Sequence, residues 1–109
     1  MKISELREKL NVEVINEVYD KEVTGVFISD MVSDIIGGAA AGNVLVTVQT
    51  HKNVIAAANL VDIPAIIITQ NNKPSEEMIS MANKTQITLF SIGENGWKVA
   101  QKLYEAGLR

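Results

Sequence analysis

The sequence predicts a three-layer α/β domain, in which a mainly parallel sheet of four to five strands has helices on both faces. Two observations predict this fold class. Short runs rich in β-branched residues alternate with helical segments from residue 23 to the C-terminus. The runs at residues 44–49 and 65–69 are almost continuously apolar, which is typical of parallel strands that are covered on both faces.

The first elements are predicted from caps and valines. Ser4 is expected to cap a short helix over residues 5–10, whose first turn carries an acid. The valines of residues 12–18 predict a short strand, either antiparallel or at an edge of the sheet. Residues 23–29 predict the next strand, and Asp30 is the expected N-cap of the helix that follows it.

The rest of the chain repeats helix and strand at short spacing, which builds parallel sheets through right-handed crossovers. Further strands are predicted at residues 44–49, 65–69 and 87–91, and helices at residues 31–41, 52–61, 76–84 and 95–106. Ser75 is the expected N-cap of the helix at 76–84.

The composition limits the function classes. Hydrophobic residues are 47% of the chain and charged residues 21%, so residues 1–109 are expected to form a single packed domain. The net charge of −3 argues against nucleic acid as the main partner. The absence of cysteine excludes a disulfide framework and a Cys-based zinc site.

No apolar run reaches the roughly 20 uninterrupted residues that a membrane span needs, so we expect no membrane partner. The N-terminus is charged within its first turns and does not read as a signal peptide. Together these features predict a cytoplasmic protein.

Polar side chains follow the predicted parallel strands at their carboxyl ends, where open α/β sheets bind ligands. With the segment around Thr24 they give the candidate ligand-binding residues, which are Thr24, Gly25, Ser29, Asp30, Thr50, His51, Asn53, Thr69, Asn71 and Ser91. Neighbouring helix N-termini would favour a small anionic ligand, for example a nucleotide. The alternative interpretation is that these residue types only cap helices and turns.

His51 is the only histidine. As an acid or base it would need an orienting carboxylate, such as Asp30, Asp34 or Glu94. The favoured interpretation is a histidine that bonds to backbone at the start of the helix after it. Phosphate-loop, dinucleotide-binding, GxSxG and HExxH motifs are missing, so we predict no catalytic residue, no metal site and no cofactor.

Two helices predict self-association. The helix at residues 52–61 is apolar around nearly its whole circumference, and the helix before it ends in a Gly/Ala run, 37–42, that permits close backbone approach. Both features predict a homodimer with a two-fold interface. Ala57→Glu is expected to disrupt this interface, because a buried unpaired charge is costly.

Several segments resemble a DRTGG domain, and they cover most of the chain. They are Asp20-Lys-Glu-Val-Thr-Gly25, residues 26–34, residues 44–51, and the strand at 65–69 with the polar turn at 71–74. Thr24 and Gly25 match the motif that names the family, Lys21 stands for its arginine, and Val26 occupies the place of its second glycine.

The resemblance implies an α/β domain similar to the N-terminal domain of HPr kinase/phosphorylase. It also implies a regulatory or assembly role, with catalysis carried by other domains. The chain is therefore expected to be a homodimeric adaptor that acts with a protein partner still to be identified. The alternative is a small-ligand sensor or an enzyme that uses the polar rim.

Overall fold

The computed structural model describes all residues, 1–109. Its elements are α1 (Ile3–Leu10), β1 (Glu13–Val14), β2 (Gly25–Ile28), α2 (Val32–Gly38), β3 (Asn43–Thr47), α3 (Lys52–Leu60), β4 (Ala65–Ile68), α4 (Glu76–Thr85), β5 (Thr88–Ser91) and α5 (Gly96–Glu105). None of these helices is long and apolar enough to cross a membrane.

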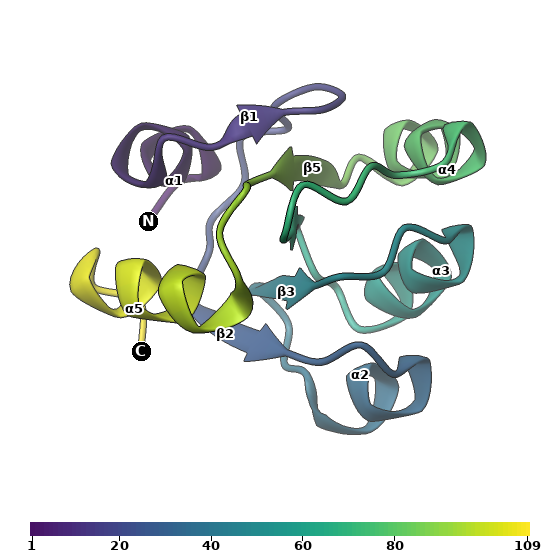
Figure 1. Ribbon diagram of the computed structural model, residues 1–109. Helices are drawn as coiled ribbons and strands as arrows, with labels where there is room; N and C mark the ends of the chain where they lie inside the picture. Colours follow the sequence, from purple (N-terminus) through teal and green to yellow (C-terminus); the bar gives the residue numbers. More distant parts are fainter.

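A five-stranded sheet in the order β1-β5-β4-β3-β2 forms the middle layer. Strands β2 to β5 are parallel, and β1 pairs antiparallel with β5 at the edge. Helices α2, α3 and α4 cover one face, and α1 and α5 cover the other (Figure 1). The predicted fold class is confirmed, including an edge position for the first strand.

The path of the chain positions the carboxyl edge of the sheet. Strands β2 to β5 lie side by side in chain order, so their three connecting helices all lie on one face (Figure 1). After β5 the chain turns to the other face and forms α5. The N-terminus of α5 therefore lies near the carboxyl ends of the strands from the side opposite to α2, α3 and α4.

Alternate residues of the central strands feed two separate cores, which explains the apolar runs. Val46, Ile67 and Phe90 pack with buried residues of α1 and α5. Leu45 and Ile66 pack with buried residues of α2, α3 and α4. A strand covered on both faces needs apolar residues at every position, and this is what the sequence predicted.

Helix α3 lies between α2 and α4 and packs against both. Val54, Ile55, Ala57 and Ala58 are buried in this way within one chain. Much of the apolar circumference is therefore covered without a partner. Ala57→Glu was the wrong choice as an interface test, because it would place a charge in the core of the domain.

Two predicted N-caps are wrong because their side chains bond elsewhere. The N-cap of α1 is Lys2, and Ser4 lies in the first turn with Asp20 as its partner. The N-cap of α2 is Met31, while the Asp30 carboxylate is held by β3.

Two predicted elements are shorter in the structure, and one predicted N-cap is confirmed. Helix α2 stops at Gly38, three residues earlier than the predicted 41, and the predicted strand at 12–18 is reduced to Glu13–Val14. The Ser75 hydroxyl caps α4 as predicted, accepting from the Met78 amide at 3.1 Å.

Candidate functional site

The ends of β2 and β3 are joined by Asp30. Its Oδ1 atom accepts hydrogen bonds from the Thr47 hydroxyl and the Val48 amide, each at 2.9 Å. The Asp30 carbonyl accepts another from the Gln49 side-chain amide at 3.1 Å. Asp30 Oδ2 accepts no hydrogen bond within the chain, so one carboxylate oxygen fixes the loop and the other is available.

The loops after β4 and β5 are held together through their backbones. Gln70 donates to the Glu94 carbonyl and Asn71 to the Ile92 carbonyl, both at 3.0 Å. Gln70 and Asn71 have left-handed φ values of 60° and 57°, which cost a non-glycine residue roughly 1 kcal/mol or more. The helices that follow β4 and β5 lie on opposite faces of the sheet, an arrangement that normally opens a ligand-binding crevice between the strand ends. Here the hydrogen bonds of Gln70 and Asn71 close that crevice.

A cavity of ≈ 130 Å³ lies beside these loops, between the ends of β2, β3 and β4 and the start of α5. Its polar lining includes Asp30, Thr69, Gln70 and Gly96. Thr69 is only 1% exposed, and its hydroxyl has no hydrogen-bond partner in the chain. Every fully buried side-chain N or O atom in the chain has a hydrogen-bond partner. The Thr69 hydroxyl has none, so it is not fully buried and keeps a small solvent-exposed area.

His51 is the N-cap of α3 by position, but its side chain makes no capping hydrogen bond. Only its backbone takes part, accepting from the Val54 amide at 3.1 Å. The interpretation of a histidine side chain bonded to backbone is therefore wrong. The side chain is exposed, and Glu94 forms an ion pair with Lys102 instead of orienting it.

The remaining predicted residues do not converge on one site. Thr24 and Gly25 lie at the amino end of β2, at the edge of the sheet opposite the cavity. Ser91 is buried in β5, paired with Ile68 and with Glu13 of β1. Three others lie near the carboxyl edge without lining the cavity, namely Ser29, Thr50 and Asn53.

Two features of the cavity were missed in the sequence. Thr47 is a hydroxyl residue in an apolar run, and a buried hydroxyl requires a partner, which is Asp30. The first turn of α5 was not recognised as facing the strand ends. Trp97, the only tryptophan, is a large, exposed hydrophobic residue in that turn. Its position at the start of the last predicted helix could have drawn attention to this turn.

A second surface lies between α2 and α3. An apolar groove of ≈ 350 Å³ is lined there by Val32, Ile36, Asn53, Ala56, Ala57 and Leu60, and we call it the α2–α3 surface. The side chains of Ile36 and Leu60 are 44% and 68% exposed. No charged residue lines the groove, and its exposed area is mostly apolar.

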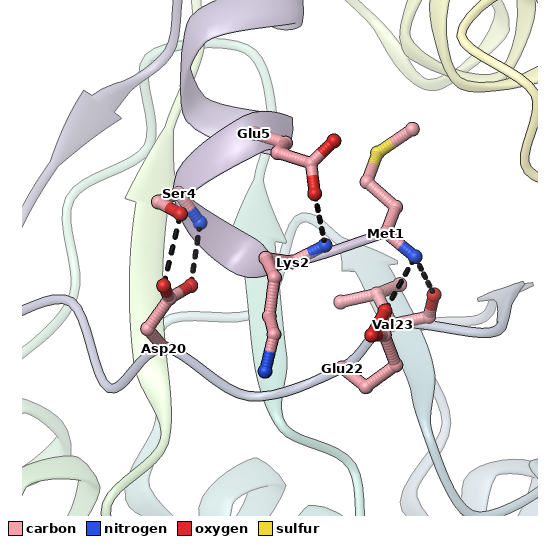
Figure 2. A network of polar contacts seen from close by, with 7 residues as sticks. All are labelled: Met1, Lys2, Ser4, Glu5, Asp20, Glu22 and Val23. Carbon is pink, nitrogen blue, oxygen red and sulfur yellow. Dashed lines mark hydrogen bonds and ion pairs between the residues drawn. The ribbon is translucent and has the colours of Figure 1, made fainter.

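The segment that resembles the family motif has a structural role at α1 (Figure 2). Asp20 accepts hydrogen bonds from the Ser4 amide at 2.9 Å and the Ser4 hydroxyl at 3.0 Å. The N-terminal ammonium contacts Glu22 at 2.6 Å and the Val23 carbonyl at 3.3 Å. These acceptors satisfy donors at the start of α1, so Asp20 acts as a cap that is distant in sequence.

These contacts also shift the acidity of both carboxyl groups. Hydrogen bonds from Ser4 lower the pKa of Asp20 below its usual range. The hydrogen bond and charge of the N-terminal ammonium lower the pKa of Glu22. Both groups are therefore held in the ionised form by the folded chain.

The sequence profile of the DRTGG domain matches residues 5–106. This chain belongs to the DRTGG domain family. The resemblance drawn from residues 20–25 and from the strands at 44–51 and 65–69 is therefore confirmed. No curated protein matches the chain.

A solved structure shares the fold. It is the CBS and DRTGG region of the regulatory part of Clostridium perfringens pyrophosphatase, complexed with the activator diadenosine tetraphosphate. The TM-score is 0.71 at 16% identity, covering 93% of this chain and 45% of that chain. The present chain thus spans less than half of the regulatory region. The regulatory role belongs to the neighbour, and at 16% identity the likeness shows only that the two share a fold.

Proposed function

We propose that this chain is a non-catalytic regulatory domain that works by pairing with a second copy of itself through the α2–α3 surface. The observation that carries the proposal is the uncharged groove with Ile36 and Leu60 exposed beside it. Contiguous apolar area of this kind on a small domain marks an interaction surface. A two-fold axis through it would place α2 and α3 against their own copies, which is the commonest arrangement in soluble oligomers.

The helices of this surface are suited to close packing. Gly37 is exposed on α2, and a Cβ built there would meet no atom within 4 Å. Ala56 on α3 is exposed and lines the groove. Ala56 permits a second copy to approach the groove closely, and Ile36 and Leu60 would supply the larger contacts, whereas Gly37 lies outside the groove.

Light scattering at micromolar concentration tests this proposal. The expected mass is about twice the 11.9 kDa of one chain. Ala56→Glu should yield a folded monomer, because the charge would be buried only in the dimer. Ser80→Glu is the matched control on α4, where Ser80 is exposed and makes no hydrogen bond, and it should remain a dimer. A monomeric wild type, or a dimeric Ala56→Glu, contradicts the proposal.

A second candidate function is the sensing of a small ligand at the carboxyl edge. It is supported by the unpartnered Thr69 hydroxyl in the cavity, and by the activator held by the regulatory region of the neighbour. A thermal-shift screen with phosphate, acetate and nucleotides tests for an anionic ligand. A ligand at 100 times its Kd adds about 2.7 kcal/mol to the unfolding free energy, so binding would be evident.

A further inference from the structure

We propose that the cavity at the carboxyl edge binds a small zwitterion of the α-amino acid class. This inference deepens the second candidate function, ligand sensing, and does not depend on dimerisation. It rests on the opposite electrostatic character of the two sides of the cavity.

One side of the cavity attracts a positive group or a hydrogen-bond donor. Asp30 is the only charged residue in the lining. Its Oδ1 atom is already held by Thr47 and Val48, which fixes the orientation of the carboxylate. Its Oδ2 atom has no partner within the chain. An ammonium group bound there would form a charge-assisted hydrogen bond with a preorganised acceptor.

The other side attracts a negative group or a hydrogen-bond acceptor. Gly96 and Trp97 are the first two residues of α5, and their amides have no carbonyl partner within the helix. The Asn95 side chain caps only the Lys98 amide, at 3.1 Å. The N-terminus of a helix carries partial positive charge, which favours a carboxylate.

Thr69 is the independent observation that points to a ligand. Its side chain is almost completely buried, its hydroxyl is unpartnered, and the residue lines the cavity between the end of β4 and α5. The hydroxyl keeps a small exposed area at the cavity, so a ligand there can supply the hydrogen-bond partner that the chain does not. A carboxylate seated at the first turn of α5 would accept a hydrogen bond from this hydroxyl.

A simple ion satisfies only one side of the cavity. An anion alone would meet Asp30, with no basic residue in the lining to offset it. A cation alone would meet the positive end of α5. A zwitterion presents each group to its complement. The cavity of ≈ 130 Å³ is open to solvent, so its size suits a small amino acid, and a larger ligand would extend out of it.

The side chain of the ligand would meet apolar walls. The hydrophobic residues of the lining are Ile28, Val46 and Val48. We therefore expect glycine, L-alanine and L-serine to enter. Large side chains and whole nucleotides would extend beyond the cavity, because pockets that enclose drug-sized ligands measure roughly 300–1,000 Å³.

Titration of the full-length chain with L-alanine, followed by the emission of Trp97, tests the proposal. Trp97 is the only tryptophan and follows Gly96 of the cavity lining, so its emission reports on changes beside the cavity. Saturable binding of L-alanine is expected. Acetate and methylamine, which each carry one of the two charged groups, should bind at least about tenfold more weakly.

Two conservative variants assign the binding to the cavity. Asp30→Asn keeps an acceptor for Thr47 and Val48 and should weaken L-alanine about tenfold or more, because a charge-assisted hydrogen bond is lost. Thr69→Val removes only the hydroxyl and should weaken it severalfold. The matched controls are Asp34→Asn and Thr50→Val, which alter residues outside the cavity and should bind as the wild type does.

Three outcomes would overturn the inference: no saturable binding by glycine, L-alanine or L-serine, equal binding of acetate, or unchanged binding by Asp30→Asn. If phosphate or a nucleotide stabilises the chain while amino acids do not, ligand sensing survives and the zwitterion is excluded. If no compound binds, ligand sensing fails along with it, and the light-scattering result still decides the assembly proposal.

Discussion

The two helical layers of this domain expose different kinds of side chain to solvent. On one side, α1 and α5 expose charged side chains, together with Trp97 and Tyr104. Asp20, Glu22 and the N-terminal ammonium connect α1 to the neighbouring loop (Figure 2). On the other side, α2 and α3 contain only Asp34 and Lys52 as charged residues, whereas α4 contains Glu76, Glu77 and Lys84. There α2 and α3 leave Ile36 and Leu60 exposed.

Both layers expose large hydrophobic side chains, so the contrast lies in charge, which is scarce on α2 and α3 and frequent on α1 and α5. Both layers bury a full core against the sheet, so the difference does not concern folding. It concerns the outer side of the helices, where polar residues normally face water. The layer with an apolar outer side is the one that we propose meets a second copy.

The largest effect is expected from a buried and an exposed leucine, one on each layer. Leu6 of α1 is 0% exposed, and Leu60 of α3 is 68% exposed. Leu6→Ala should lower the unfolding free energy by about 2–5 kcal/mol, through lost burial and a cavity. Leu60→Ala should change that of the isolated chain by less than about 0.5 kcal/mol.

Urea denaturation measures both leucine variants, at protein concentrations low enough to keep the chain monomeric. A large loss for Leu60→Ala under these conditions would mean that Leu60 stabilises the single chain. The contrast between the two layers would then be wrong.

An intermediate effect is expected from adjacent glycines in α2. A Cβ at Gly38 would lie 2.9 Å from the Phe27 ring, whereas one at Gly37 would meet no atom within 4 Å. Gly38→Ala should therefore destabilise the chain by about 1 kcal/mol or more. Gly37→Ala should stabilise the monomer by about 0.5–1 kcal/mol, because alanine loses less conformational freedom in a helix.

Thermal unfolding ranks these two glycine variants, and they serve as controls for each other. If Gly37→Ala stabilises the chain at low concentration but weakens the dimer, Gly37 lies in the interface. Equal effects from both substitutions would contradict the packing of Gly38 on Phe27.

The smallest effect is expected on the pH dependence of stability, through the two carboxyl groups that contact α1. The pKa values of Asp20 and Glu22 lie below their ordinary values of 3.8 and 4.5 in the folded chain. The unfolded chain thus binds protons first, and this stabilisation is present above about pH 4.5 and lost as the pH falls through the lower folded values. The double variant Asp20→Asn, Glu22→Gln should lose part of this acid dependence.

Melting temperatures between pH 6 and pH 2.5 measure that dependence. The double variant Glu8→Gln, Asp34→Asn removes the same charge from exposed residues without hydrogen bonds, and serves as the control. Identical pH profiles for the two double variants would show that the network in Figure 2 contributes nothing.

Much of the fold was predictable because periodicity reports burial directly. The apolar runs at β3 and β4 could belong only to strands covered on both faces, and the spacing of the helices fixed a parallel sheet. Caps were less predictable. Ser4 and Asp30 have the right residue types for N-caps, but their partners are Asp20 and Thr47, which are distant in sequence. Local propensity carries no information on such contacts.

The candidate site was predicted in part, for a similar reason. The rule that ligands bind at carboxyl ends of strands located Asp30 and Thr69 correctly beside one cavity. It could not show that Gln70 and Asn71 adopt left-handed conformations that close the neighbouring crevice. Nor could it place the first turn of α5, because the face on which the last helix packs follows from the path of the whole chain.

Sedimentation equilibrium of Leu60→Glu and Tyr104→Glu tests the central claim most directly. Leu60 and Tyr104 are large, exposed hydrophobic residues, 68% and 59% exposed, on opposite layers of the domain. The wild type and Tyr104→Glu should sediment at about twice 11.9 kDa, and Leu60→Glu at the mass of one chain. A dimeric Leu60→Glu with a monomeric Tyr104→Glu would place the interface on the α1–α5 layer and contradict the account.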